Sequence, residues 1–219
     1  MLMSSLRLYT YFRSSAAYRV RIALNLKELA YTAVPVHLLR GGGEQHSEAF
    51  GAVNPARLVP VLEDDGAVIT QSLAIIEYLE ETHPAPALLP LDARGRARVR
   101  SLAYSIACDI HPLSNLRVLR YLKSVFDRDV AQREEWTRHW IREGFEALER
   151  QLSLSAETGS YCHGETPSMA DCCLVPQMVN AQRAQLPLDG YPVLRRIYES
   201  CQRLPAFAAA APGMQPDAE

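Results

Sequence analysis

The first part of the chain alternates between short apolar stretches of strand type and longer stretches with helical periodicity. Residues 6–12 are rich in aromatic and apolar side chains and predict a strand, whereas residues 16–29 carry apolar side chains at helical spacing. Residues 31–38 return to alternation, with Val34 and Val36 on one side. This order predicts two parallel strands joined by a right-handed crossover.

A second pair of strands contains a proline. Residues 58–62 are apolar with Pro60 among them. Because proline has no N–H, Pro60 must lie at a strand start, at an edge or after a cis bond. An Asp-Asp-Gly turn then predicts a hairpin with residues 67–70, and a helix from Ser72 is expected to end before Pro84.

The pattern changes after a proline-rich stretch at residues 84–92. Helical periodicity without a convincing strand occupies residues 94–122, 133–154, 168–184 and 193–204. We therefore predict an α/β domain at residues 1–83, a linker at 84–92 and an all-helical domain at 93–219. The alanine run and the Pro-Gly pair close to Glu219 predict a frayed tail.

Composition excludes several classes of protein. A formal charge of -2 argues against nucleic acid or an anionic membrane as the main partner, and no apolar stretch is long enough to span a bilayer. The basic, serine-rich start is also typical of a transit peptide, but the strand pattern of residues 6–12 argues against that reading. Five cysteines without paired C-x-x-C spacing predict reduced thiols, a cytoplasmic protein and no metal site.

Two helices are expected to start directly after strands, each with a hydroxyl residue at its N-terminus. These starts are Ser14-Ser15 and Gln71-Ser72. A helix N-terminus stabilises an anion, and serine hydroxyls can donate to it, so these starts and Pro60 suggest one anion site. The alternative is that a serine only caps its helix. Ser168 and Asp171 predict a purely structural capping box on a later helix.

Longer motifs carry a resemblance that covers almost the whole chain. They are residues 11–15, 18–24, 54–55, 59–60, 71–81 and Asp171 with 174–177. The sequence resembles the zeta class of the glutathione transferase superfamily. The resemblance implies an α/β thioredoxin-like N-terminal domain that binds glutathione, and an all-α C-terminal helical bundle that supplies most of the second-substrate pocket. It also implies a homodimer.

The resemblance further implies a set of glutathione contacts. Ser14 and Ser15 would face the sulfur, Val59 would bind the cysteinyl part beside a cis Pro60, Gln71 and Ser72 would hold the γ-glutamyl end, Gln45 would help fix the tripeptide, and His111 with Asn115 would lie near the dimer-side contacts. Ala16 stands where many zeta enzymes carry cysteine, so a protein thiol is not expected to take part.

The implied activity is glutathione-dependent cis-trans isomerisation of maleylacetoacetate to fumarylacetoacetate in tyrosine breakdown. The substrate is a dianion, so arginines should flank the sulfur, and the candidates are Arg13, Arg117 and Arg183. Three alternatives remain open at this stage: isomerisation of maleylpyruvate in gentisate breakdown, displacement chemistry on small haloacids, and a binding domain without catalysis. Loss of catalysis is disfavoured because Ser14 and Arg13 are both kept.

Overall fold

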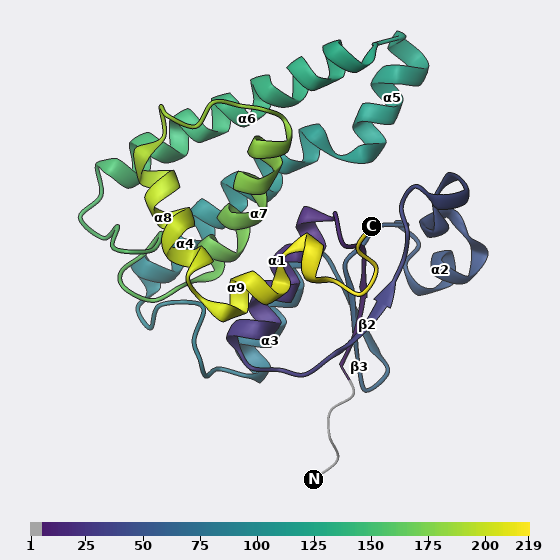
Figure 1. Cartoon of the computed structure of the whole chain (residues 1–219). Helices are drawn as coiled ribbons and strands as arrows, with labels where there is room; N and C mark the ends of the chain where they lie inside the picture. Colours follow the sequence, from purple (N-terminus) through teal and green to yellow (C-terminus); the bar gives the residue numbers. More distant parts are fainter. Residues whose placement is uncertain (1–5) are drawn as a thin grey trace. The chain divides into compact units, whose positions relative to one another are not determined.

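The structure, a computed structural model, describes residues 6–219 and divides into two compact units (Figure 1). The N-terminal unit combines the chain up to Leu88 with Arg203–Glu219, and the second unit is Leu89–Gln202. Residues 203–219, which the sequence pattern groups with the helical domain, thus belong to the N-terminal unit. Among residues 6–219, no helix combines the length and the apolar character needed to cross a membrane.

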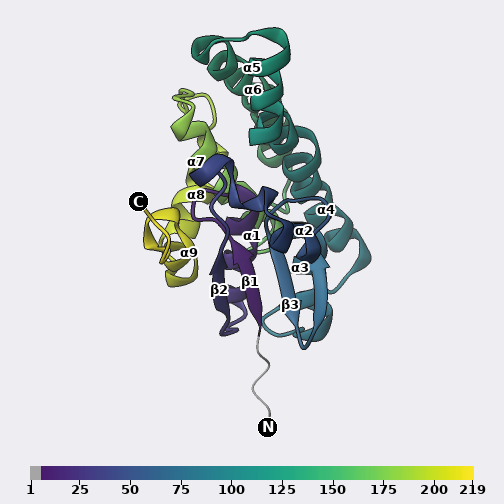
Figure 2. The ribbon, with the colours of Figure 1, turned by 90° about the vertical axis from the view of Figure 1, so that its right-hand side faces the viewer.

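The N-terminal unit is built on a four-stranded sheet of order β2-β1-β3-β4, of which Figure 2 shows the first three strands side by side. The strands are β1 (Arg7–Thr10), β2 (Thr32–Pro35), β3 (Val61–Asp64) and β4 (Ala67–Thr70). β1 pairs with β2 in parallel, whereas β3 is antiparallel to both β1 and β4. The predicted parallel pair and the predicted hairpin are confirmed.

This topology gathers several chain segments at one edge of the sheet. β4 runs in the same direction as β1, so both strands end at the same edge, and β3 begins there because Val61 pairs with Tyr9 and Thr70. Helices α1 (Ser15–Leu26) and α3 (Ser72–Thr82) follow β1 and β4. Their N-termini therefore meet at the edge where the chain enters β3.

A buried apolar cluster packs beside this edge of the sheet. The short helix α2 (Glu48–Val53) places Phe50 in a buried cluster with Val59, Val61, Tyr11 and other apolar side chains. The peptide bond between Val59 and Pro60 is cis, and Pro60 directly precedes β3. Pro60 therefore takes a position that needs no ladder N–H, as its chemistry requires.

The expectation of a frayed tail is wrong. Helix α9 (Pro205–Ala210) packs along α1 (Figure 1), and Phe207 and Ala210 are fully buried. Small alanine side chains let the backbones approach, so that Arg21 Nε and Asn25 Nδ2 donate to carbonyl oxygens of α9 at 3.0 and 2.9 Å. Further along, the carboxylate of Asp217 accepts the N–H of Phe12 at 2.9 Å.

The second unit is helical, as predicted. Its helices are α4 (Ala93–Tyr104), α5 (Leu116–Phe126), α6 (Val130–Ser153), α7 (Met169–Arg183) and α8 (Pro192–Gln202). Within residues 94–122, where periodicity predicts helical structure, a π-helical turn and a 3-10 turn separate α4 from α5. Pro112 lies in the 3-10 turn and Asn115 caps a new helix, which explains the break.

The predicted capping box at the start of α7 is confirmed. Asp171 Oδ2 accepts from the N–H and the hydroxyl of Ser168, both at 2.8 Å, and Oδ1 accepts from the N–H of Cys162 at 2.9 Å. Burial raises the pKa of Asp171, and these hydrogen bonds oppose that shift. The box is a structural device of the second unit.

The Asp217 contact yields a stability prediction. Asp217→Ala removes the acceptor of a part-buried backbone N–H beside α1, so we expect the free energy of unfolding to fall by about 1–2 kcal/mol. Urea denaturation measures the change. Glu199→Ala, at an exposed position of α8, is the control and should change it by less than about 0.5 kcal/mol. Equal losses in the two variants would contradict the interpretation.

Candidate functional site

The edge of the N-terminal sheet brings together three separate segments that the sequence marked. They are Ser14-Ser15 at the start of α1, Val59-Pro60 before β3, and Gln71-Ser72 at the start of α3. Two helix N-termini at one edge present unpaired backbone N–H groups and partial positive charge. The arrangement suits a ligand that carries negative charge and peptide groups.

Ser14 is the N-cap of α1. Its Oγ accepts the N–H of Ala17 at 3.2 Å, and its side chain is half-buried. A hydroxyl that accepts through a lone pair keeps its proton for donation to another group. The capping interpretation of Ser14 is therefore confirmed, and it is compatible with a hydrogen bond from the same hydroxyl to an anion.

The neighbours of Ser14 differ in exposure. Ser15 is the first residue of α1 and is 8% exposed, whereas Arg13 is exposed. Ala16 is half-buried in the first turn of the helix. Arg13 is thus accessible to solvent beside Ser14, while Ser15 is held within the first turn of α1.

Gln71 holds an unusual backbone conformation at the start of α3. Its φ of 71° and ψ of 118° lie in a backbone region that residues other than glycine rarely adopt. The Gln71 side chain makes no capping hydrogen bond. Such strain persists where the surrounding structure enforces it, and it is concentrated at functional sites. The exposed Gln71 side chain is therefore available to a ligand.

Gln45 carries an unsatisfied polar atom. It lies in the loop after β2 and is 5% exposed, and within residues 6–219 its Oε1 has no hydrogen-bond donor. Its Nε2 is 3.4 Å from the carbonyl oxygen of Leu38. A buried amide oxygen without a donor costs free energy, so a ligand N–H at this position would be favoured.

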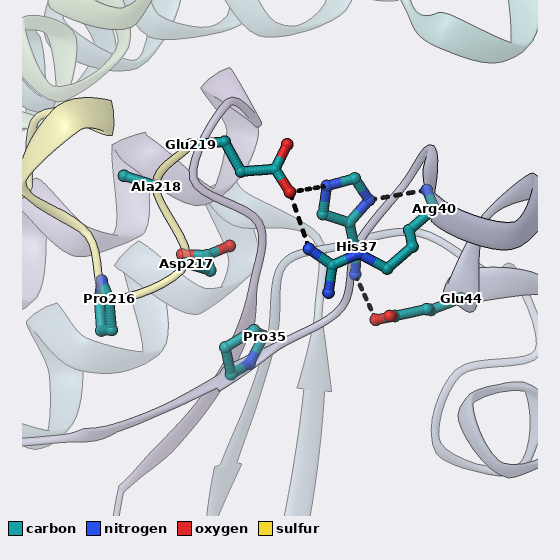
Figure 3. A pocket seen from close by; sticks show the side chains of 8 residues that line it. All are labelled: Pro35, His37, Arg40, Glu44, Pro216, Asp217, Ala218 and Glu219. Carbon is teal, nitrogen blue, oxygen red and sulfur yellow. Dashed lines mark hydrogen bonds and ion pairs between the residues drawn. The ribbon is translucent and has the colours of Figure 1, made fainter.

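A cavity of about 460 Å³ lies beside this loop but is a poor candidate for the site. Figure 3 shows its lining, in which Glu219 bridges His37 and Arg40 at 3.3 and 2.7 Å. Glu44 and Asp217 add two further carboxylates. None of the residues predicted from sequence lines this cavity, and Arg40 already has Glu219 as an ion-pair partner.

The second unit carries the remaining predicted residues in two separate segments of the chain. His111 opens the 3-10 turn before α5, and Asn115 is the N-cap of α5, where its Oδ1 accepts the N–H of Arg117 at 3.1 Å. Arg117 lies in the first turn of α5 and Arg183 in the last turn of α7, and both are exposed. His111, Asn115 and Arg117 thus belong to one short segment, and Arg183 to another helix.

Four of the five cysteines are buried in the second unit. Cys162 and Cys172 are fully buried, and burial raises the pKa of both thiols. Burial also raises the pKa of Cys201. The reactive form of cysteine is the thiolate, so these residues behave as packing groups at neutral pH.

Sequence reasoning missed two contacts near the edge. Arg19 Nη1 donates to Ser72 Oγ at 3.2 Å, and Asp217 holds the N–H of Phe12 two residues before Ser14. The signal for Arg19 was present in the sequence, because an arginine inside an otherwise buried helical stretch requires internal partners. Nothing local could have indicated Asp217, which lies about 200 positions further along the chain.

The chain is similar to known proteins over almost its whole length. Residues 8–87 match the family model described as glutathione S-transferase, N-terminal domain, and residues 130–200 match the glutathione S-transferase, C-terminal domain. A probable maleylacetoacetate isomerase of Vibrio cholerae is 52% identical over 216 residues, which is 99% of this chain and 100% of that protein. The chain belongs to the glutathione S-transferase family.

Solved structures agree with the zeta-class resemblance. A bacterial maleylpyruvate isomerase in holo form, described as a zeta-class glutathione S-transferase, matches with a TM-score of 0.95 and 48% identity, over 97% of this chain and 100% of that one. A maleylacetoacetate isomerase of Methylobacterium extorquens AM1, solved with bound malonate and glutathione, matches with a TM-score of 0.93 and 43% identity, over 97% and 99%. The predicted fold class is confirmed.

The backbone of Gln71 yields a second stability prediction. Gln71→Gly should raise the free energy of unfolding by about 1 kcal/mol, because glycine adopts a positive φ without strain. Gln71→Ala is the matched control, since it removes the same side chain but keeps the strain. Thermal unfolding of both variants checks this, and a gain in the alanine variant alone would contradict the strain argument.

Proposed function

We propose that the protein is a glutathione-dependent cis-trans isomerase that converts maleylacetoacetate to fumarylacetoacetate. The observation that carries the proposal is the start of α1, where Ser14 caps the helix and keeps a hydroxyl proton for an anion. The named activities of the isomerases reported above support it. When bound, glutathione supplies a thiolate that adds to the cis double bond, allows rotation about the resulting single bond and is eliminated unchanged.

The residues at the sheet edge fit glutathione. The buried Oε1 of Gln45 needs a donor, and a tripeptide has backbone N–H groups to offer. Gln71 and Ser72, at the N-terminus of α3, would hold the γ-glutamyl end, and Val59 beside Pro60 would bind the cysteinyl backbone. His111 and Asn115 would contribute in a homodimer, a state that we propose on family resemblance.

The start of α1 can hold a thiolate at neutral pH. Lowering a thiol pKa from about 8.5 to about 6.5 takes roughly 2.7 kcal/mol of preferential stabilisation. A hydroxyl hydrogen bond to an anion contributes about 1.5–3 kcal/mol and a helix N-terminus about 0.3–1 kcal/mol. Ser14 and the N-terminus of α1 can together supply stabilisation of this size, with Ser15 as a second hydroxyl in the first turn.

Cationic side chains complete the proposed chemistry. Arg13 adjoins Ser14 and is exposed, so it can bind a substrate carboxylate beside the sulfur. Arg117 and Arg183 are proposed as further carboxylate ligands from the second unit. The bound malonate in the Methylobacterium enzyme supports a dicarboxylate substrate class. We place the reaction in cytoplasmic tyrosine breakdown.

Maleylpyruvate is the second candidate substrate. The zeta-class structure with a TM-score of 0.95 is a maleylpyruvate isomerase, and the same arginines could bind either dianion. Comparing kcat/KM for the two substrates, each with and without glutathione, decides between them. Activity on maleylacetoacetate that requires glutathione is the expected result. Bound glutathione without isomerisation of either substrate would instead favour haloacid chemistry or a binding domain.

Two serine variants test the division of roles. Ser14→Ala should lower kcat at saturating glutathione by about 100-fold, because it removes the thiolate donor. Ser72→Ala should mainly raise the KM for glutathione, by about 10-fold. Asp92→Ala controls for loss of an N-cap, since Asp92 caps α4 in the second unit and lies outside the proposed chemistry. An unchanged kcat in Ser14→Ala would remove Ser14 from the mechanism.

A further inference from the structure

Arg19 is a buried cation that contacts the first residue of α3. It lies in α1 and is 2% exposed, and its Nη1 donates to Ser72 Oγ at 3.2 Å. Ser72 is itself 6% exposed and is the first residue of α3. Side chains from two helices thus form one buried hydrogen bond at the edge where both helices begin.

This hydrogen bond determines what Ser72 can do. A serine hydroxyl has one proton and two lone pairs, and a guanidinium can only donate. The lone pair of Ser72 that faces Arg19 is therefore occupied, and the hydroxyl proton must point elsewhere. A group that binds Ser72 from the other side meets a donor, which selects an acceptor such as a carboxylate.

The charge of Arg19 acts in the same direction. A guanidinium stays protonated at neutral pH, and its field is screened less inside the protein than in water. The N-terminus of α3 adds its own partial positive charge beside Ser72. The two contributions favour a negative group at Ser72 over a neutral group of similar size.

We infer that Arg19 is a positioning residue that makes the Ser72 end of the site selective for a carboxylate-bearing γ-glutamyl group. The inference rests on the proposed function, in which Ser72 holds that end of glutathione. Arg19 acts through the Ser72 hydroxyl and by its charge. It is not required for the chemistry at the sulfur, which the start of α1 supports.

The test compares glutathione with 4-aminobutyryl-cysteinylglycine, which lacks only the γ-glutamyl carboxylate. Dissociation constants are measured by titration calorimetry on the full-length protein. Wild type should bind glutathione at least about 10-fold more tightly than the analogue. Arg19→Met should reduce this ratio to below about 2, while kcat at saturating glutathione stays within about twofold of wild type.

Two further variants separate positioning from folding. In a Ser72→Ala background, Arg19→Met should change glutathione affinity by less than about threefold, since most of its effect passes through Ser72. Lys27→Met is the matched control, because Lys27 is a buried cation at the other end of α1 and pairs with Glu80 at 2.8 Å. It should lower the unfolding temperature and leave the binding ratio unchanged.

Several results would overturn the inference. One is an unchanged ratio in Arg19→Met, and another is an equal loss of the ratio in Lys27→Met. Should Arg19→Met fail to fold, Arg19→Gln carries the comparison. The ratio should fall at least about threefold, because glutamine is polar but lacks the positive charge, and an unchanged ratio contradicts the inference. Wild type that binds both tripeptides equally overturns only the role of Arg19, whereas wild type that binds neither overturns the proposed function as well.

Discussion

The burial of two arginines in one helix is the constraint on which the N-terminal unit depends. Arg19 and Arg21 lie in α1 and are 2% and 0% exposed. A buried guanidinium needs hydrogen-bond acceptors, and Arg21 finds them on the carbonyls of Tyr11, Phe12 and Ala210 and on a threonine hydroxyl. Burial lowers the pKa of Arg21 to about 10, so it remains charged at neutral pH.

These contacts link the packing of the N-terminal unit to the two helix starts of the candidate site. Arg21 ties the backbone that leads into Ser14 to the C-terminal helix α9, and Arg19 reaches the start of α3 through Ser72. The two helix N-termini at the sheet edge are thus held by side chains of the same helix. A site that stabilises an anion needs such prior organisation, because flexible dipoles would reorient at a free-energy cost.

Local sequence patterns predicted the elements that local chemistry controls. The hairpin between β3 and β4 follows from an Asp-Asp-Gly turn, and the caps at Ser14 and Ser168 follow from hydroxyl side chains before apolar helical stretches. The interruption before α5 lies within one stretch of helical periodicity and is marked in the sequence only by Pro112. Periodicity reports which face is apolar and does not register a turn of different helical type.

Sequence patterns alone are enough to predict the class of fold, to name candidate residues for an anion site, and to reveal the motifs of the glutathione S-transferase family. Three features become visible only in the folded chain: α9 packs against α1, Asp217 accepts the N–H of Phe12, and Arg19 donates to Ser72. The physical reason is the separation along the chain between interacting residues. Caps and turns depend on neighbours within a few residues, so a local pattern is enough to predict them. The partners of a buried charge can lie anywhere in the chain and become neighbours only when the fold has formed.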